Sequence, residues 1–152
     1  MDFPQAEFVR TRSATLEVFR AGPAGGPAIV LCHGWPEHAY SWRHQIPVLA
    51  AAGFDVIVPN QRGYGGSSCP EAIEAYDITA LTDDLEDLLI HYGHEQAIFV
   101  GHDWGALVVW AMAVLKPARV RAVANLSVSY LRRGSEDWVS FWRKALGPKH
   151  YI

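Results

Sequence analysis

Short apolar segments that alternate with longer amphipathic segments constrain the fold of this chain more than any other feature. Ala28–Cys32, of sequence AIVLC, is continuously apolar and follows a cluster of turn-forming residues over 21–27. Such a run is typical of a strand buried on both faces of a parallel sheet. The later strands expected are 54–59, 97–100 and 120–126, and the helices expected between them are 45–52, 77–91 and 105–115. Strands that alternate with helices predict the α/β class, with right-handed crossovers.

The residues before this alternation predict an antiparallel addition to the sheet. Segments 7–12 and 15–20 alternate between apolar and polar residues, as half-buried strands do. We expect the two segments to pair as an opening hairpin. Gly53 and Gly93 follow two of the expected helices, and a glycine in that position is typical of a helix end.

The composition limits the class of protein. A chain of 152 residues is long enough for one domain with a hydrophobic core, and a formal net charge of −3 gives no electrostatic reason to expect nucleic acid or an anionic membrane as a partner. Cys32 and Cys69 form neither a metal spacing nor a disulfide framework. The first residues show no signal-peptide pattern, and no apolar run approaches the roughly 20 residues that span a bilayer. We therefore expect a cytoplasmic protein.

The pentapeptide Gly101-His102-Asp103-Trp104-Gly105 lies where an expected buried strand turns directly into an expected helix. Such a sharp turn needs glycine on both sides, because a side chain at Gly101 or Gly105 would collide with neighbouring backbone. The helix that follows directs N–H groups and its positive dipole end at Asp103. This is the nucleophile-elbow pattern with aspartate in place of serine. The alternative is an incidental acid at an ordinary strand–helix junction.

Aspartate at this position predicts a different reaction from that of a serine hydrolase. An aspartate is anionic at neutral pH, so it displaces a leaving group from saturated carbon without first losing a proton to a base. The product is an ester of Asp103, which water must then hydrolyse. That second step needs a general base for the water and N–H donors for the oxyanion. Serine-type esterase, lipase or peptidase chemistry is therefore disfavoured.

Two backbone N–H groups are the candidate oxyanion donors. Trp104 supplies one directly after the nucleophile, and Trp35 supplies the other from the loop of sequence HGWPE at 33–37. His33 lies within this loop, and we expect it to shape the loop rather than to act as a base. His33, His38 and His44 match no usual metal-ligand spacing, so no metal ion is expected.

The acidic run Asp83-Asp84-Leu85-Glu86-Asp87 also invites a metal hypothesis. It lies on an expected amphipathic helix, where acids are favourable near the N-terminal half. We expect it to form the solvated face of that helix.

The order of these motifs resembles the epoxide hydrolases of the α/β-hydrolase fold. HGWPE, then YSWRHQIPVLAAAGFDVIVPNQRGYGGSS, GHDWGALVVW and PARVRAVANLSV follow one another as in that family, from about Phe8 to Ser129. The resemblance implies an α/β-hydrolase core, a mostly parallel sheet with flanking helices, covered by a helical cap. The epoxide-opening site is expected between core and cap. The residues that support the motifs are His33, Gly34, Pro36, Gly101, His102 and Gly105.

The resemblance also implies the reaction, the hydrolysis of a small-molecule epoxide to a vicinal diol with water and no cofactor. In that family two cap tyrosines protonate the epoxide oxygen, and the segment 149–152 resembles the motif of the first, so Tyr151 is the candidate. An ordinary aromatic residue is the alternative for Tyr151. The family usually has an acid where this chain has Asn60, so a contact with a nearby basic residue is expected to differ.

The C-terminal part predicts a division of the chain. Residues 1–129 correspond to the N-terminal part of the core, and residues 130–152 correspond to the beginning of the cap, with a first helix near 136–146. The acid-bearing loop and the histidine that follow the nucleophile in such enzymes cannot be assigned. We therefore expect a fragment, truncated at the start of the cap, that forms at most a trapped ester.

Two alternatives stay open. A haloalkane dehalogenase uses the same aspartyl ester, and Trp104 would suit contact with the departing halide. Those enzymes commonly have an asparagine as second halide donor where this chain has Trp35, which favours the epoxide hypothesis. The other alternative is a non-catalytic piece, either the remnant of a broken gene or half of a split hydrolase.

Overall fold

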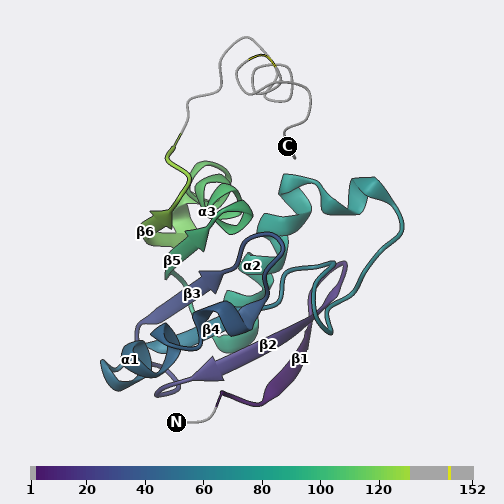
Figure 1. Ribbon diagram of the computed structural model, residues 1–152. Helices are drawn as coiled ribbons and strands as arrows, with labels where there is room; N and C mark the ends of the chain where they lie inside the picture. The colour runs from purple at the N-terminus through teal and green to yellow at the C-terminus, as the bar shows by residue number, and fades with distance from the viewer. Residues whose placement is uncertain (1–2, 131–143, 145–152) are drawn as a thin grey trace.

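One mixed β-sheet organises the residues that the computed structural model describes, which are 3–130 and 144 (Figure 1). The strands are β1 (Ala6–Arg10), β2 (Thr15–Ala21), β3 (Ala28–Cys32), β4 (Asp55–Pro59), β5 (Ala97–His102) and β6 (Val120–Leu126). The helices are α1 (Gln45–Ala51), α2 (Ile78–Tyr92) and α3 (Trp104–Leu115), with short 3-10 turns η1 (Ala39–Trp42), η2 (Ile73–Tyr76) and η3 (Pro117–Arg119).

The sheet has the order β1-β2-β4-β3-β5-β6. β1 pairs with β2, and β2 with β4, in the antiparallel sense, whereas the pairs β3–β4, β3–β5 and β5–β6 are parallel. The predicted α/β class and the opening hairpin are therefore confirmed. Because the carboxyl ends of parallel strands meet at one edge, the loops after β3, β4 and β5 gather there.

Helices cover both faces of this sheet, and in Figure 1 α1 lies in front of the sheet while α2 passes behind it. The core on the α2 and α3 face includes Val30, Leu88 and Phe99, whereas the core on the α1 face includes Leu31 and Ile46. Neighbouring residues of β3 thus belong to opposite cores, because side chains alternate across a strand. This two-sided burial explains why β3 is apolar at every position.

The junction between β5 and α3 is shorter than the sequence predicts. The expected strand ended at Val100, but β5 continues through His102 because Gly101 and His102 still pair with β6. The expected helix began at Gly105, but α3 begins at Trp104. A single residue, Asp103, therefore connects the two elements.

The acidic run of α2 was predicted to form a solvated face, and that prediction was wrong for Asp84. Asp84 is 3% exposed, and its Oδ2 lies 2.7 Å from Nε of Arg62, which follows β4. Thr11 also donates to this carboxylate, at 2.7 Å. A buried carboxylate is tolerated here because a counter-charge and hydrogen bonds replace the lost water. Both partners come from sequence-distant loops, so the helical pattern alone does not reveal them.

We expect Arg62→Met to lower the free energy of unfolding by about 3–5 kcal/mol, because the change leaves Asp84 buried without its counter-charge. The control is Arg12→Met. Arg12 pairs with Asp83, Glu86 and Asp87, but its side chain is 47% exposed, so we expect a loss of about 1 kcal/mol. Urea unfolding followed by circular dichroism measures both losses. Equal losses for the two variants would contradict the argument from burial.

Glu86 of α2 belongs to a second ion network that ties this helix to the end of α3. Lys116 Nζ donates to Glu86 Oε2 at 2.8 Å, and Arg119 Nε donates to Oε1 at 3.0 Å. The hydrogen bond from Lys116 is the largest cause that lowers the pKa of Glu86 from 4.5 to about 2. Because the folded-state pKa is depressed, the stabilisation is present above about pH 4.5 and is lost as the pH falls towards 2.

Glu86→Gln is expected to flatten the acid side of the stability profile. The wild-type chain should lose more stability than the variant between pH 4.5 and 2, with a difference of about 1 kcal/mol, the size of a partly exposed ion pair. Thermal or urea unfolding across this pH range provides the measurement. Glu71→Gln, at an exposed acid, serves as control and should leave the profile unchanged. Parallel profiles for wild type and Glu86→Gln would count against the network.

Candidate functional site

Asp103 has an unusual backbone conformation, with φ 50° and ψ −119°. In the described part of the chain, the non-glycine residues with positive φ are Asp103 and Ser127. Such a conformation costs about 1–3 kcal/mol and persists only where the surrounding structure determines it. Here β5 and α3 impose it, since each ends or begins directly beside Asp103. The turn therefore holds the aspartate at the carboxyl edge of the parallel strands.

The glycines around Asp103 permit a backbone packing that side chains would prevent. A Cβ atom at Gly101 would lie 2.6 Å from the Cα of Ala106, and one at Gly105 would lie 2.6 Å from the carbonyl oxygen of His33. The start of α3 therefore packs directly against β5 and against the loop after β3. A larger residue at either position would therefore collide with neighbouring backbone, as predicted from the sequence.

The loop after β3 brings one of the two predicted oxyanion donors to the aspartate. The backbone N–H of Trp35 donates to Oδ1 of Asp103 at 3.0 Å. A Cβ atom at Gly34 would lie 2.5 Å from the Asp103 Cβ, so only glycine allows this approach. Pro36 follows Trp35 through a cis peptide bond. Trp104, the second predicted donor, is the first residue of α3, and among the described residues its N–H forms no hydrogen bond with the carboxylate.

His33 is fully buried, and both of its ring nitrogens form hydrogen bonds, one within its own loop and one with the loop after β4. The N–H of Gln61 donates to Nε2 at 3.1 Å, so Nε2 is unprotonated and the ring proton lies on Nδ1. Nδ1 lies 2.9 Å from the Gly34 carbonyl oxygen and donates to it. Burial is the main cause that lowers the pKa of His33 and keeps the ring neutral. The arrangement fits a loop-shaping residue better than a base.

Glu37 connects the loop 33–37 to β5, the strand that precedes Asp103. Its Oε2 accepts a hydrogen bond from the Gly34 N–H at 3.2 Å and lies 3.0 Å from Nδ1 of His102. Burial alone would raise the pKa of Glu37, but the hydrogen bonds from His102 and Gly34 outweigh it and lower the pKa. Sequence reasoning assigned no contact to Glu37, although its position three residues after Gly34 was the available signal.

The loop after β4 also reaches the site, which sequence reasoning missed. The ring of Tyr64 packs edge-on against His33, with centroids 4.8 Å apart. Burial raises the pKa of Tyr64, and the negative charge of Asp103 raises it further. Tyr64 and Gln61 therefore belong to the surroundings of Asp103. The motif NQRGYGGSS carried the signal, but only the fold brings this loop beside the one after β3.

Asn60, which stands where the family resemblance implies an acid, has two polar partners. Its Oδ1 accepts from the Ala39 N–H at 2.6 Å, and its Nδ2 donates to Oε2 of Glu17 at 2.6 Å. The side-chain partner of Asn60 is thus an acid, and the expected change in a contact with a basic residue stays a prediction. An amide suits this place because it both donates and accepts, whereas a second carboxylate would face Glu17.

Some predicted features lie outside the described residues. They are Tyr151 and the helix near 136–146, so the cap boundary at 129 and the role of Tyr151 stay predictions. Within 3–130 and 144, no group of three His, Cys, Asp or Glu side chains could hold a metal ion. In the same residues no helix is long and apolar enough to cross a membrane.

Comparison with known proteins finds relatives that are named epoxide hydrolases. Epoxide hydrolase A of Mycobacterium tuberculosis is 52% identical over 151 residues, which are 99% of this chain and 47% of that protein. The bifunctional epoxide hydrolase 2 of Sus scrofa is 51% identical over 106 residues, 70% of this chain and 19% of the relative. The chain therefore spans about half the length of the first relative and less of the second.

Solved structures agree with these relatives. Epoxide hydrolase A from Mycobacterium thermoresistibile superposes with a TM-score of 0.93 at 54% identity, over 98% of this chain and 47% of that one. An epoxide hydrolase from Vigna radiata gives 0.90 at 34% identity, over 97% and 47%. A family model described as the alpha/beta hydrolase fold matches residues 27–148. The chain thus belongs to the alpha/beta hydrolase fold family, and within it to the chains that resemble epoxide hydrolases.

Proposed function

We propose that Asp103 is the nucleophile of an epoxide hydrolase reaction and that the Trp35 N–H is an oxyanion donor. The observation that carries the proposal is the 3.0 Å hydrogen bond from Trp35 N to Asp103 Oδ1, at a turn that forces φ to 50°. The names of the similar proteins support the substrate class. Because the chain spans about half of the first relative, the proposal is limited to the roles of residues within this chain.

The first step uses the two carboxylate oxygens differently. Oδ1 is held by the Trp35 N–H, so Oδ2 is the atom that attacks a ring carbon of the epoxide. A C–O bond forms at Oδ2 as the ring C–O bond breaks, and the ring oxygen takes the electron pair and a proton from an acid. Tyr151 is the candidate acid. Oδ1 becomes the carbonyl oxygen of the ester.

The second step builds negative charge on Oδ1. Water adds to the ester carbonyl carbon after losing a proton to a base, and the oxyanion lies where the Trp35 N–H already points. Trp104, at the start of α3, is the second candidate donor. The bond between the carbonyl carbon and Oδ2 then breaks, and Oδ2 leaves as a hydroxyl oxygen of the diol with the remaining proton of the water. The water oxygen completes the restored Asp103 carboxylate, and the proton on the base returns to the acid of the first step. His33 does not suit the role of base, because both of its ring nitrogens are already hydrogen-bonded, Nδ1 to the Gly34 carbonyl and Nε2 to the Gln61 N–H.

The haloalkane dehalogenase alternative uses the same ester. Trp35 stands where an asparagine would favour that reaction, and the relatives reported above carry epoxide hydrolase names, so the epoxide hypothesis is preferred. The proposed partners are a small-molecule epoxide and water, without a cofactor. A cytoplasmic location is proposed from the sequence alone.

Incubation of the 152-residue chain with a small aryl epoxide should add the mass of one epoxide per chain. Peptide mapping by mass spectrometry should place the ester on Asp103. We expect Asp103→Asn to reduce labelling at least 100-fold, since a neutral amide is a poor nucleophile. Asp83→Asn, which changes an acid on α2, should leave labelling unchanged.

The other hypotheses give different results in the same experiment. Release of halide from a haloalkane without an epoxide adduct would favour the dehalogenase. Absence of both reactions in a folded chain would favour the non-catalytic alternative. Steady conversion of epoxide to diol by the purified chain would contradict the expectation of a trapped ester.

A further inference from the structure

Gln61 is a buried polar residue whose backbone nitrogen and side-chain amide nitrogen both donate to His33. It is 8% exposed; its backbone N–H donates to His33 Nε2 at 3.1 Å, and its side-chain Nε2 donates to the His33 carbonyl oxygen at 2.7 Å. Gln61 thus forms hydrogen bonds with both the ring and the main chain of His33. His33 is the first residue of the loop 33–37, which carries the Trp35 N–H and is called the donor loop below.

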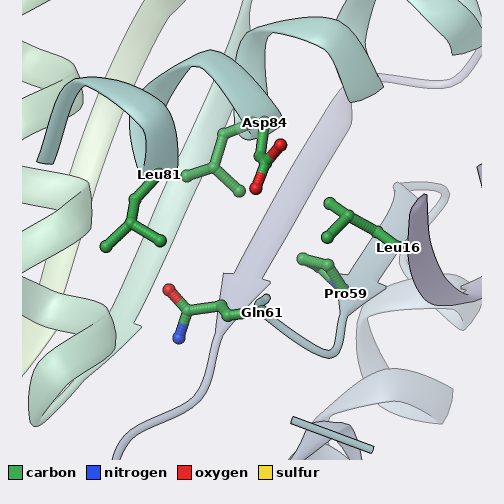
Figure 2. Close-up of a pocket in the computed structure, with 6 residues that line it drawn as sticks. Leu16, Pro59, Gln61, Leu81 and Asp84 are labelled. Atoms are coloured by element: carbon green, nitrogen blue, oxygen red, sulfur yellow. The ribbon is translucent and has the colours of Figure 1, made fainter. Parts of the chain in front are cut away.

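The surroundings of Gln61 explain why its side-chain amide needs a hydrogen-bond partner. Figure 2 shows Gln61 opposite Leu81 and Asp84 of α2, at a cavity that Leu16 and Pro59 close from the other side. The cavity holds about 10 Å³, and most of its lining is apolar. A side-chain amide in such surroundings needs a partner, because an unpaired buried donor costs about 1–3 kcal/mol. The His33 carbonyl is the partner that the fold provides.

The hydrogen bonds then pass from Gln61 to the aspartate through one peptide unit. Because Gln61 N–H occupies His33 Nε2, the ring proton stays on Nδ1 and is donated to the Gly34 carbonyl. That carbonyl and the Trp35 N–H belong to the same planar peptide group and point in opposite directions. A hydrogen bond that fixes the carbonyl therefore also aims the N–H, which donates to Asp103 Oδ1 at 3.0 Å.

The peptide unit between His33 and Gly34 is also hydrogen-bonded at both its carbonyl and its N–H. Its carbonyl oxygen, on His33, accepts from the Gln61 side chain, and its N–H, on Gly34, donates to Glu37. Two successive peptide planes are thus each bound at both ends. The Gly34 carbonyl also accepts from the Glu37 N–H at 3.1 Å. Of these five contacts, the side-chain bond of Gln61 is the one that a substitution at position 61 removes without changing a residue of the loop 33–37.

We propose that Gln61 is a positioning residue, which sets the Trp35 N–H on Asp103 Oδ1 by holding the His33 carbonyl. The catalytic meaning of this role rests on the proposed function. Loss of the side-chain bond should let the peptide planes rotate and move the N–H away from Oδ1. Ester formation should then slow by about tenfold, because a shift of less than the roughly 1 Å that costs about 100-fold still misplaces the carboxylate.

The test compares Gln61→Met with Gln96→Met. The first removes the side-chain donor to His33 and keeps the backbone N–H. The second removes a similar bond, from Gln96 Nε2 to the Ala118 carbonyl at 3.0 Å, away from the site. Two readouts are measured on the 152-residue chain: the ¹H–¹⁵N resonance of the Trp35 amide, and the rate of epoxide labelling at Asp103.

We expect Gln61→Met to move the Trp35 amide resonance upfield, because its hydrogen bond to a carboxylate weakens. Asp103→Asn gives the reference for a lost charge. Labelling should slow about tenfold in Gln61→Met and stay at the wild-type rate in Gln96→Met. An unchanged Trp35 resonance together with an unchanged labelling rate in Gln61→Met would overturn the proposal.

A second variant covers the case in which Gln61→Met does not fold. Gln61→Glu has the same shape but faces the His33 carbonyl with an acceptor, so it should displace the Trp35 resonance as well, and an unmoved resonance would overturn the proposal. If the wild-type chain is not labelled at all, the proposed function fails, and the amide resonance still decides the role of Gln61.

Discussion

The hydrogen bond between the Trp35 N–H and the Asp103 carboxylate requires two backbone segments to lie closer than side chains would permit. Gly34 faces the Asp103 Cβ, and Gly105 faces the carbonyl of His33. Once these segments are in contact, the turn between β5 and α3 has room for a single residue, whose φ becomes positive. The site geometry is thus a consequence of main-chain packing. This packing fixes the position of Asp103, and the Asp103 carboxylate does not itself hold the two segments together.

Around this contact, buried polar groups are arranged so that nearly every one has a partner. His33, Gln61, Asn60 and Asp84 are each buried and each bind groups from other elements. Because an unpaired buried polar group costs about 1–3 kcal/mol, these residues specify one arrangement of the loops after β3 and β4. Apolar packing builds the two cores, whereas hydrogen bonding fixes the edge where the loops meet.

Much of the fold follows from local patterns. β3 and β6 have the predicted limits, and α2 is shifted by one residue, since periodicity and glycine stops act locally. The position of Asp103 between strand and helix was also predictable from the flanking glycines. The partner of Asp84 and the contacts of Gln61 were not, because each depends on a residue tens of positions away. Charge pattern alone places an acid on the surface until its counter-charge is known.

Gln61 and Arg62 are adjacent in the chain but bind in different directions, one to His33 beside Asp103 and the other to Asp84 on α2. Local opening of this loop would therefore expose a buried charge and release the donor loop at the same time. Such an event would be a partial unfolding at the carboxyl ends of the central strands β3 and β4, and not the movement of a single surface loop. The amide protons of this region should then exchange with solvent as one cooperative unit, together with those at the centre of the sheet.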